Sequence, residues 1–137
     1  MMYSQNAAAQ YRAVRSHGLV ANAGPSRLVQ IMFEYILSSL ATTQGCMERI
    51  QDNLPLNEVV AKGKAMGAAV RLIGQLNGTL DMERGGQIAE NLRALYIYML
   101  NRLTAANVTN DARIVAEVSL LVRTVKTGWD QIVADGR

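Results

Sequence analysis

Residues 83–100 read ERGGQIAENLRALYIYML, and the glycine pair Gly85 and Gly86 opens an apolar run with helical spacing. A glycine pair before a helix can cradle a phosphate, or it can break the chain between two helices. A phosphate-binding loop would need Gly-Lys-Ser/Thr after a strand, whereas Gln87 follows this pair and the acidic Glu83 precedes it. These neighbours favour a plain turn, so the stretch predicts the start of a helix.

Four segments of the chain repeat this helical spacing, and they begin near Pro25, Pro55, Gly86 and Asn110. Apolar residues recur in each at steps of three and four, which is typical of one buried helix face and not of a strand. Proline is tolerated at the first position of a helix, so both prolines favour helix starts. The inward positions predict a core that contains Leu28, Ile31, Tyr35, Val70, Ile73, Leu92, Leu95, Met99, Leu121 and Trp129.

Short connections near 52–54, 81–85 and 107–110 separate the four predicted helices. Short loops join antiparallel neighbours, so we predict an all-α fold, an antiparallel up-and-down four-helix bundle. We expect one domain over 1–137, with the bundle at 25–134. Residues 1–22 are predicted to form a short N-terminal helical arm, because Tyr11, Val14 and Leu19 share an apolar side but the segment is too short and polar for a core helix.

Composition excludes several classes of protein. The net charge is only +3, charged residues make up 18% of the chain, and no run of Lys or Arg marks a nucleic-acid-binding tail. No apolar run reaches the roughly 18 residues that a membrane span needs, and the N-terminus does not resemble a signal peptide. A single cysteine fits a reducing compartment. We therefore expect a cytoplasmic protein with protein partners, without nucleic acid and without direct membrane insertion.

The residues that carry catalytic and metal chemistry are sparse. The only histidine, His17, lies outside the predicted bundle, and no inward stripe carries a carboxylate for a metal site. The only cysteine, Cys46, has no nearby histidine to activate it, and no Ser/His/Asp set can be assembled. The sequence therefore predicts a protein that is not an enzyme and that needs no cofactor or metal.

The second predicted helix carries four glycines on a narrow arc, although each interior glycine costs roughly 1 kcal/mol relative to alanine. Two interpretations remain open: close packing against a neighbouring bundle helix, or a shallow shelf where the backbone of a partner approaches. We expect Met32, Met66 and Met99 in the core, and Met47 and Met82 at the rim of a binding surface. The candidate partner-binding residues from the residue pattern are Met47, Tyr98, Gly63, Gly67, Gly74 and Gly78.

The block that starts at the end of the second predicted helix resembles the signature of the FliS family of flagellar secretion chaperones: Leu80-Asp81-x-Glu83-x-Gly85-Gly86-x-Ile88-Ala89-x-Asn91-Leu92-x-x-Leu95-Tyr96-x-Tyr98-Met99. The resemblance continues through Leu103, Ala106-Asn107-x-x-Asn110-Asp111, Glu117-Val118, Leu120-Leu121 and Trp129. Met2-Tyr3 and Tyr11 match tyrosines of that family, and Ala23-Gly24-Pro25-x-x-Leu28 resembles its Ala-Ser-Pro-x-x-Leu motif. Two departures are Gly24 in place of the usual serine and the glycines of the second helix.

The resemblance implies a bacterial export chaperone that binds the C-terminal segment of flagellin, prevents premature polymerisation, and delivers flagellin to the flagellar type III export apparatus. It implies a membrane export-gate protein as a second partner and leaves room for a co-chaperone or regulator. By position, the arm residues Tyr11 and Val14 are the family-implied contacts that lie over a groove or dock at the gate. Simple packing of Tyr11 on the bundle is the alternative.

A different class of function remains open beside the chaperone reading. The glycine-rich helix could form a self-interface, which would make the chain a non-catalytic homo-oligomer or adaptor. A basic nucleic-acid binder is a third hypothesis, which the weak net charge disfavours.

Overall fold

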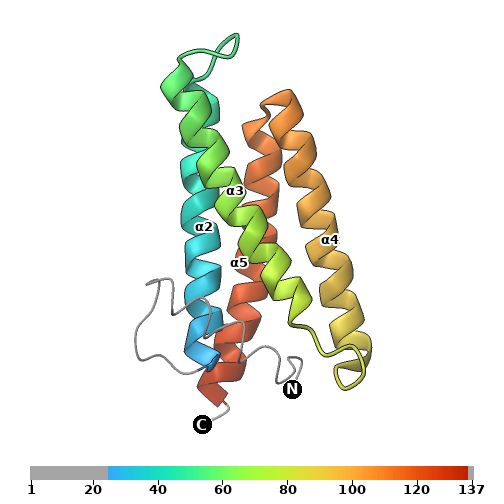
Figure 1. Cartoon of the computed structure of the whole chain (residues 1–137). Helices are drawn as coiled ribbons and strands as arrows, with labels where there is room; N and C mark the ends of the chain where they lie inside the picture. Colours follow the sequence, from blue (N-terminus) through green and yellow to red (C-terminus); the bar gives the residue numbers. More distant parts are fainter. Residues whose placement is uncertain (1–24, 136–137) are drawn as a thin grey trace.

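The structure, a computed structural model, describes residues 25–135, and this part of the chain is helical apart from its connecting turns (Figure 1). Its helices are α2 (Pro25–Arg49), α3 (Leu56–Gly78), α4 (Gly86–Thr109) and α5 (Ala112–Asp135). The predicted all-α class and the predicted helix starts at Pro25, near Pro55 and at Gly86 are confirmed. The proposed arm at 1–22 lies outside the described residues.

The four helices form a ring in which each packs against two others. Helix α2 contacts α3 and α5, and α4 contacts the same two helices from the other side. Successive helices run in opposite directions along the bundle, as Figure 1 shows. The prediction of an antiparallel up-and-down bundle is therefore confirmed.

The turns explain where the helices begin and end. Pro55 precedes α3 with an extended backbone, φ −73° and ψ 152°, and so starts that helix without a side-chain cap. Asn110 ends α4 in the left-handed region, φ 52° and ψ 46°, which asparagine tolerates well. Its side-chain amide donates to the carbonyl oxygen of Met47 at 3.1 Å and accepts from Lys62 Nζ at 3.2 Å. This one side chain therefore connects the α4–α5 turn to both α2 and α3.

The glycine pair of the opening stretch is a tight turn between α3 and α4. A Cβ added at Gly85 would lie 2.5 Å from Ala89 Cβ and 2.8 Å from the carbonyl oxygen of Asp81, so no larger residue fits without a backbone shift. Gly86 has φ +53°, a conformation that side chains rarely adopt. Both glycines therefore serve the turn geometry, in agreement with the prediction of a plain turn.

The core lies between all four helices, and it differs in part from the predicted set. Leu28, Ile73, Met99 and Trp129 are buried as expected. Leu92, Leu95 and Leu121 pack against this core but are only partly buried, and Ile31 is also only partly buried. Other residues complete the core, and they include Phe33, Ile36, Leu40, Leu72, Leu76, Tyr96, Leu103 and Val122.

Two predicted core residues are exposed, so those predictions were wrong. Tyr35 is 44% exposed, because Ile36 beside it takes the inward position on α2. Val70 is 37% exposed, because Ala69 and Ile73 turn the inward face of α3 away from it. Both members of such apolar pairs fit helical spacing, and only packing against neighbours decides which one is buried.

None of the helices that the structure describes is long and apolar enough to cross a membrane.

Candidate functional site: an apolar groove between α4 and α5

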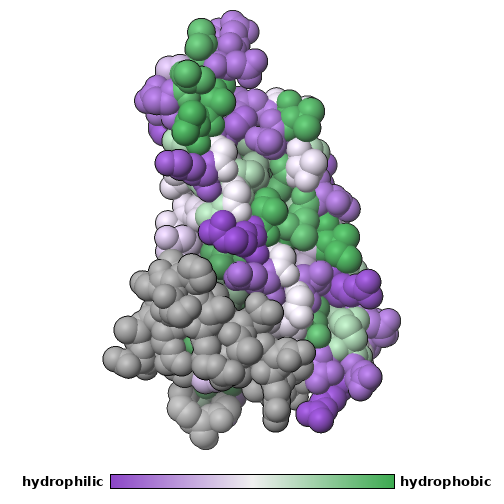
Figure 2. Space-filling model, viewed as in Figure 1, coloured by the Kyte–Doolittle hydropathy of each residue, from purple (hydrophilic) through white to green (hydrophobic). Residues whose placement is uncertain are grey.

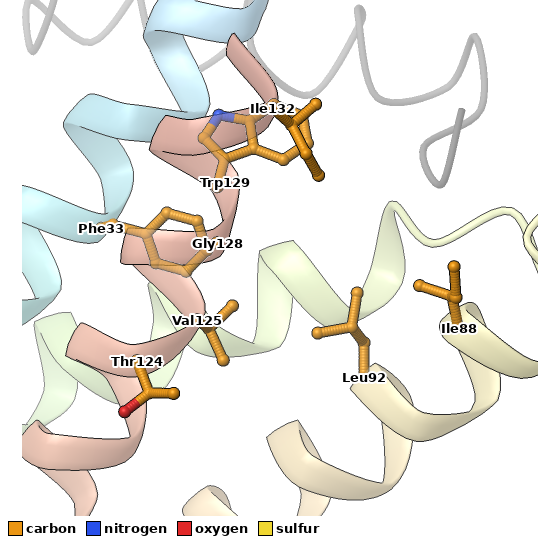
Figure 3. A pocket seen from close by; sticks show the side chains of 8 residues that line it. All are labelled: Phe33, Ile88, Leu92, Thr124, Val125, Gly128, Trp129 and Ile132. Atoms are coloured by element: carbon orange, nitrogen blue, oxygen red, sulfur yellow. The ribbon is translucent and has the colours of Figure 1, made fainter. Parts of the chain in front are cut away.

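A groove of about 230 Å³ lies between α4 and α5, at the end of the bundle away from the turn that joins these two helices (Figure 3). We call it the α4–α5 groove, and its lining residues are Phe33, Ile88, Leu92, Thr124, Val125, Gly128, Trp129 and Ile132. Helix α4 supplies one wall, α5 supplies the other, and Phe33 of α2 reaches its inner side. The groove therefore lies at the start of α4, directly after the glycine turn.

The groove has an exposed rim and a buried floor. Ile88 is 61% exposed and Ile132 is 50% exposed, although both are large aliphatic residues. Phe33 and Trp129 are buried beneath them. Figure 3 shows Ile88 and Leu92 on α4 facing the α5 residues across the opening. Aliphatic side chains left in water at the rim of an apolar hollow are typical of a protein-binding surface.

The two polar groups in the lining already donate hydrogen bonds elsewhere. The hydroxyl of Thr124 donates to the carbonyl oxygen of Leu120 at 2.9 Å, within α5. Trp129 Nε1 donates to the carbonyl oxygen of Ser26 at 3.1 Å, which ties the end of α5 to the start of α2. Among residues 25–135, no charged side chain lines the groove. Its surface therefore favours an apolar occupant, since a charge placed there would be desolvated without a partner.

Asp130, near the end of α5, forms an ion pair within its helix and a hydrogen bond to α2. Asp130 accepts from Lys126 Nζ at 2.6 Å and from Gln30 Nε2 of α2 at 2.8 Å. The bond from Lys126 is the main reason that the pKa of Asp130 lies below its usual value. The bond from Gln30 joins the end of α5 to α2 beside Trp129, which lies in the floor of the groove.

Away from the groove, along the line of contact between α4 and α5 that we call the seam, Glu117 of α5 joins the two helices. Tyr98 donates its phenol hydrogen to Glu117 Oε2 at 2.6 Å, and Arg102 Nε donates to Glu117 Oε1 at 2.9 Å. These bonds lower the pKa of Glu117, the bond from Tyr98 contributing most, and the same bond raises the pKa of Tyr98. Polar contacts therefore join α4 and α5 at Glu117, away from the groove.

A second, shallower hollow of about 270 Å³ lies on the other side of α4. It is lined by Met82, Glu90, Arg93, Ala94 and Ile97, and so it mixes apolar and charged groups. Met82, expected at the rim of a binding surface, is partly exposed here.

The predicted partner-binding residues fall into three groups. Tyr11 and Val14 lie outside the described residues. Met47 is buried at 3% exposure, so its expected place on a rim was wrong: it packs into the core at the end of α2. Tyr98 is 43% exposed, but its hydroxyl is held by Glu117 and its ring lies on the seam, outside the lining of the groove.

The glycines of α3 lie on the exposed face of that helix. A Cβ added at any of the four would meet nothing within 4 Å, so close packing against a bundle helix was the wrong interpretation. The inward face of α3 is formed by Met66, Ala69, Leu72, Ile73 and Leu76, which places the glycines roughly opposite it. The structure therefore leaves the shelf open and does not bring it together with the α4–α5 groove.

Groups with catalytic potential are held in structural contacts. Burial raises the pKa of Cys46, with Glu58 adding to the effect, so its thiol is a poor nucleophile. Arg49 pairs with Glu58 at 3.0 Å and lowers the pKa of that carboxylate. Within residues 25–135, no three side chains of His, Cys, Asp or Glu are grouped to hold a metal ion.

Sequence reasoning missed the residues that make the groove. Phe33 and Ile132 were not among the predicted core or partner-binding residues, and their spacing does not single them out, whereas Leu92 and Trp129 were expected in the core. Gly128 offered the one local signal, because a glycine inside a predicted helix costs stability and asks for an explanation.

A helical bundle with an apolar groove between two of its helices is an arrangement typical of modules that bind apolar segments of other proteins. The family whose description is "Flagellar protein FliS" matches residues 6–136, nearly the whole chain. The chain belongs to this FliS family, and the resemblance noted in its sequence is confirmed. The family is one of chaperones, in agreement with the expectation of a protein that is not an enzyme.

Curated relatives match this chain over most of their lengths. The chain is 43% identical over 131 residues to the flagellar secretion chaperone FliSB of Pseudomonas aeruginosa. The match covers 96% of this chain and 98% of the relative. It is 36% identical over 132 residues to the flagellar secretion chaperone FliS of Salmonella typhimurium, covering 96% and 93%. The FliS chaperone of Vibrio cholerae is 34% identical over 122 residues, covering 89% and 85%.

Proposed function

We propose that this protein is a cytoplasmic export chaperone that binds the C-terminal segment of flagellin. Binding would prevent premature polymerisation and deliver flagellin to the flagellar type III export apparatus. Membership of the FliS family supports the general role. The observation that carries the binding proposal is the α4–α5 groove, whose uncharged lining and exposed rim isoleucines suit the apolar face of a helix.

The energetics require more than one contact. When a client segment that is disordered alone becomes helical on binding, its ordering lowers the binding free energy gained by about 2–5 kcal/mol or more. Each large aliphatic side chain that becomes fully buried stabilises the complex by roughly 1.5–3 kcal/mol. One anchor in the α4–α5 groove therefore does not suffice, and we expect the segment to continue over other apolar surface of the bundle. The hollow beside Met82 and the glycine shelf of α3 are two such surfaces within the described residues.

The N-terminal arm completes the proposal. We assign Tyr11 and Val14 to contact with the client groove or with the membrane export-gate protein, by analogy with the family position of the arm. Tyr11→Ala should weaken client or gate binding with little change in the melting temperature. A large drop in melting temperature would instead make Tyr11 a structural residue.

The deciding experiment is co-purification with the flagellin of the same organism, with and without its last residues, about 40 of them, a length that forms helices of bundle size. The intact flagellin should be retained and the truncated one should be lost. Equal retention of both would remove the proposed C-terminal site, and a folded chaperone that retains neither would remove the function.

A second candidate is self-association through α3. Its exposed face carries Leu56, Val60 and Val70 among the four open glycines, so another helix could approach closely. Figure 2 shows apolar surface at the end of the bundle where α2 joins α3. Leu54 and Leu56, at the connection between these helices, are both exposed. Light scattering distinguishes the two functions. A dimer that persists at nanomolar concentration, dissociates in Gly67→Leu and ignores flagellin would favour self-association.

A further inference from the structure

The α4–α5 groove has a gap in its α5 wall. Thr124, Gly128 and Ile132 follow one another at four-residue intervals and therefore form one row along the exposed side of α5. The middle member of the row has no side chain. A Cβ added at Gly128 would meet nothing within 4 Å, so the space above it is empty within the described part of the chain.

This gap lies above the aromatic floor of the groove. Trp129 follows Gly128 in the chain and is buried, and Phe33 reaches the same lining from α2. Figure 3 shows Gly128 beside both aromatic residues, with Leu92 and Ile88 across the opening. A side chain from outside that passes Gly128 would therefore meet two aromatic rings and the aliphatic wall of α4.

The volume of the groove limits what can enter. An apolar cavity of about 150 Å³ holds a benzene-sized ring in a well-studied case, and small-molecule pockets generally measure roughly 300–1,000 Å³. At about 230 Å³, the α4–α5 groove fits one large side chain and is too small for a typical cofactor. The entering side chain must also be uncharged, because Thr124 and Trp129 already donate their hydrogens elsewhere and no lining group carries a charge.

We propose that Gly128 is a specificity-determining residue of this groove: its missing side chain admits one large apolar side chain of the bound client helix, as a knob fits a hole between two helices. The proposal rests on the proposed binding of flagellin and deepens it. A residue with a side chain at position 128 would occupy the space that the client needs, while leaving the bundle intact.

Substitutions at position 128 separate this role from a structural one. Alanine and leucine are both better helix formers than glycine, and the site is open, so Gly128→Ala and Gly128→Leu should melt at the same temperature as the wild type or higher. Gly128→Leu should nonetheless bind a peptide of flagellin's last residues, about 40 of them, at least about tenfold more weakly. The peptide affinity of Gly128→Ala should lie between those of the wild type and Gly128→Leu. If Gly128 had only a structural role, its substitutions would lower the melting temperature and the peptide affinity together.

The matched control is Thr127→Leu, which adds the same leucine at the adjacent exposed position outside the groove. It should bind the peptide as the wild type does. Trp129 provides an independent readout, because it is the only tryptophan of the chain and lies in the groove floor. Its emission should change when a tryptophan-free peptide binds the wild type or Thr127→Leu, and should change less with Gly128→Leu.

Wild-type affinity and an unchanged Trp129 response in Gly128→Leu would overturn the proposal while leaving flagellin binding in place. Loss of affinity in Thr127→Leu equal to that in Gly128→Leu would also overturn it. A wild-type protein that is folded but does not bind the peptide would remove the proposed function and this inference with it.

Discussion

Trp129 Nε1 donates a hydrogen bond of 3.1 Å to the carbonyl oxygen of Ser26, and so the last turns of α5 are joined to the first turn of α2. The bond spans nearly the whole sequence of the bundle and holds the indole in the floor of the α4–α5 groove. The stability of the bundle and the shape of the groove therefore depend on the same side chain.

We predict that Trp129→Phe lowers the free energy of unfolding by about 1–3 kcal/mol. It loses the hydrogen bond to Ser26 and leaves space that a smaller ring does not fill. Denaturant melts measure the change. Tyr35→Phe is the control, because Tyr35 lies 44% exposed on α2 and should melt as the wild type does. Equal losses in the two variants would contradict the assignment of Trp129 to the core and Tyr35 to the surface.

Asn110 offers a test of how the other end of the bundle is held. Asn110→Gly keeps the left-handed backbone and loses both side-chain bonds, to Met47 and Lys62, so we expect a loss of roughly 1–2 kcal/mol. Asn110→Ala also strains the backbone and should cost about 1–2 kcal/mol more. Thermal melts of the pair separate the two causes. If alanine were tolerated as well as glycine, the left-handed turn would not be required.

The glycines of the chain should respond to alanine in opposite directions. Gly85→Ala brings a Cβ against the Asp81 carbonyl and Ala89, and should destabilise the bundle by about 1–3 kcal/mol. Gly67→Ala meets no atom within 4 Å and should stabilise α3 by up to roughly 1 kcal/mol. Circular dichroism melts compare them. Destabilisation by Gly67→Ala would show that the face of α3 is covered.

The lowered pKa of Glu117 predicts that the protein loses part of its folding stability in acid. Its pKa is lowered in the folded state by Tyr98 and Arg102, so between the folded and unfolded pKa values the unfolded chain binds more protons. The stabilisation is therefore present above the unfolded value, about 4.3 for a free glutamate, and is lost as the pH falls through the folded pKa.

Melting temperatures of Glu117→Gln should accordingly fall less steeply with decreasing pH than those of the wild type. Asp130, Glu58 and Asp111 also have lowered pKa values, so a slope remains in the variant. Glu48→Gln, which removes an exposed carboxylate from α2, is the control and should follow the wild-type slope. Parallel slopes for Glu117→Gln and the wild type would show that the contacts with Tyr98 and Arg102 do not persist in solution.

Local patterns predict the helices well because their causes are local. Pro25 and Gly86 start helices through backbone geometry, as predicted. Asn110 was expected near the start of the last helix, whereas it ends α4 in the left-handed region and α5 begins at Ala112. The choice between neighbouring apolar residues, such as Tyr35 and Ile36, depends on where the other helices lie, and periodicity alone cannot make it. Met47 fits both a rim and a core for the same reason.

The α4–α5 groove could not be predicted from the sequence, because it arises from the divergence of two helices. Ile88 has the spacing of a core residue and becomes a rim residue only because α5 lies too far away to cover it. The family signature around Gly85 and Gly86 identified the class of protein without indicating this surface. Gly128 lies inside the last predicted helix, where a glycine costs stability, but this alone does not indicate a groove.

Titration calorimetry with a peptide of flagellin's last residues, about 40 of them, tests the central claim most directly. We predict one-to-one binding with a negative heat-capacity change, since apolar surface is buried, and weaker binding to Gly128→Leu than to Thr127→Leu. A folded wild-type protein that gives no binding heat across a range of temperatures, and no change in Trp129 fluorescence on addition of the peptide, would contradict the account.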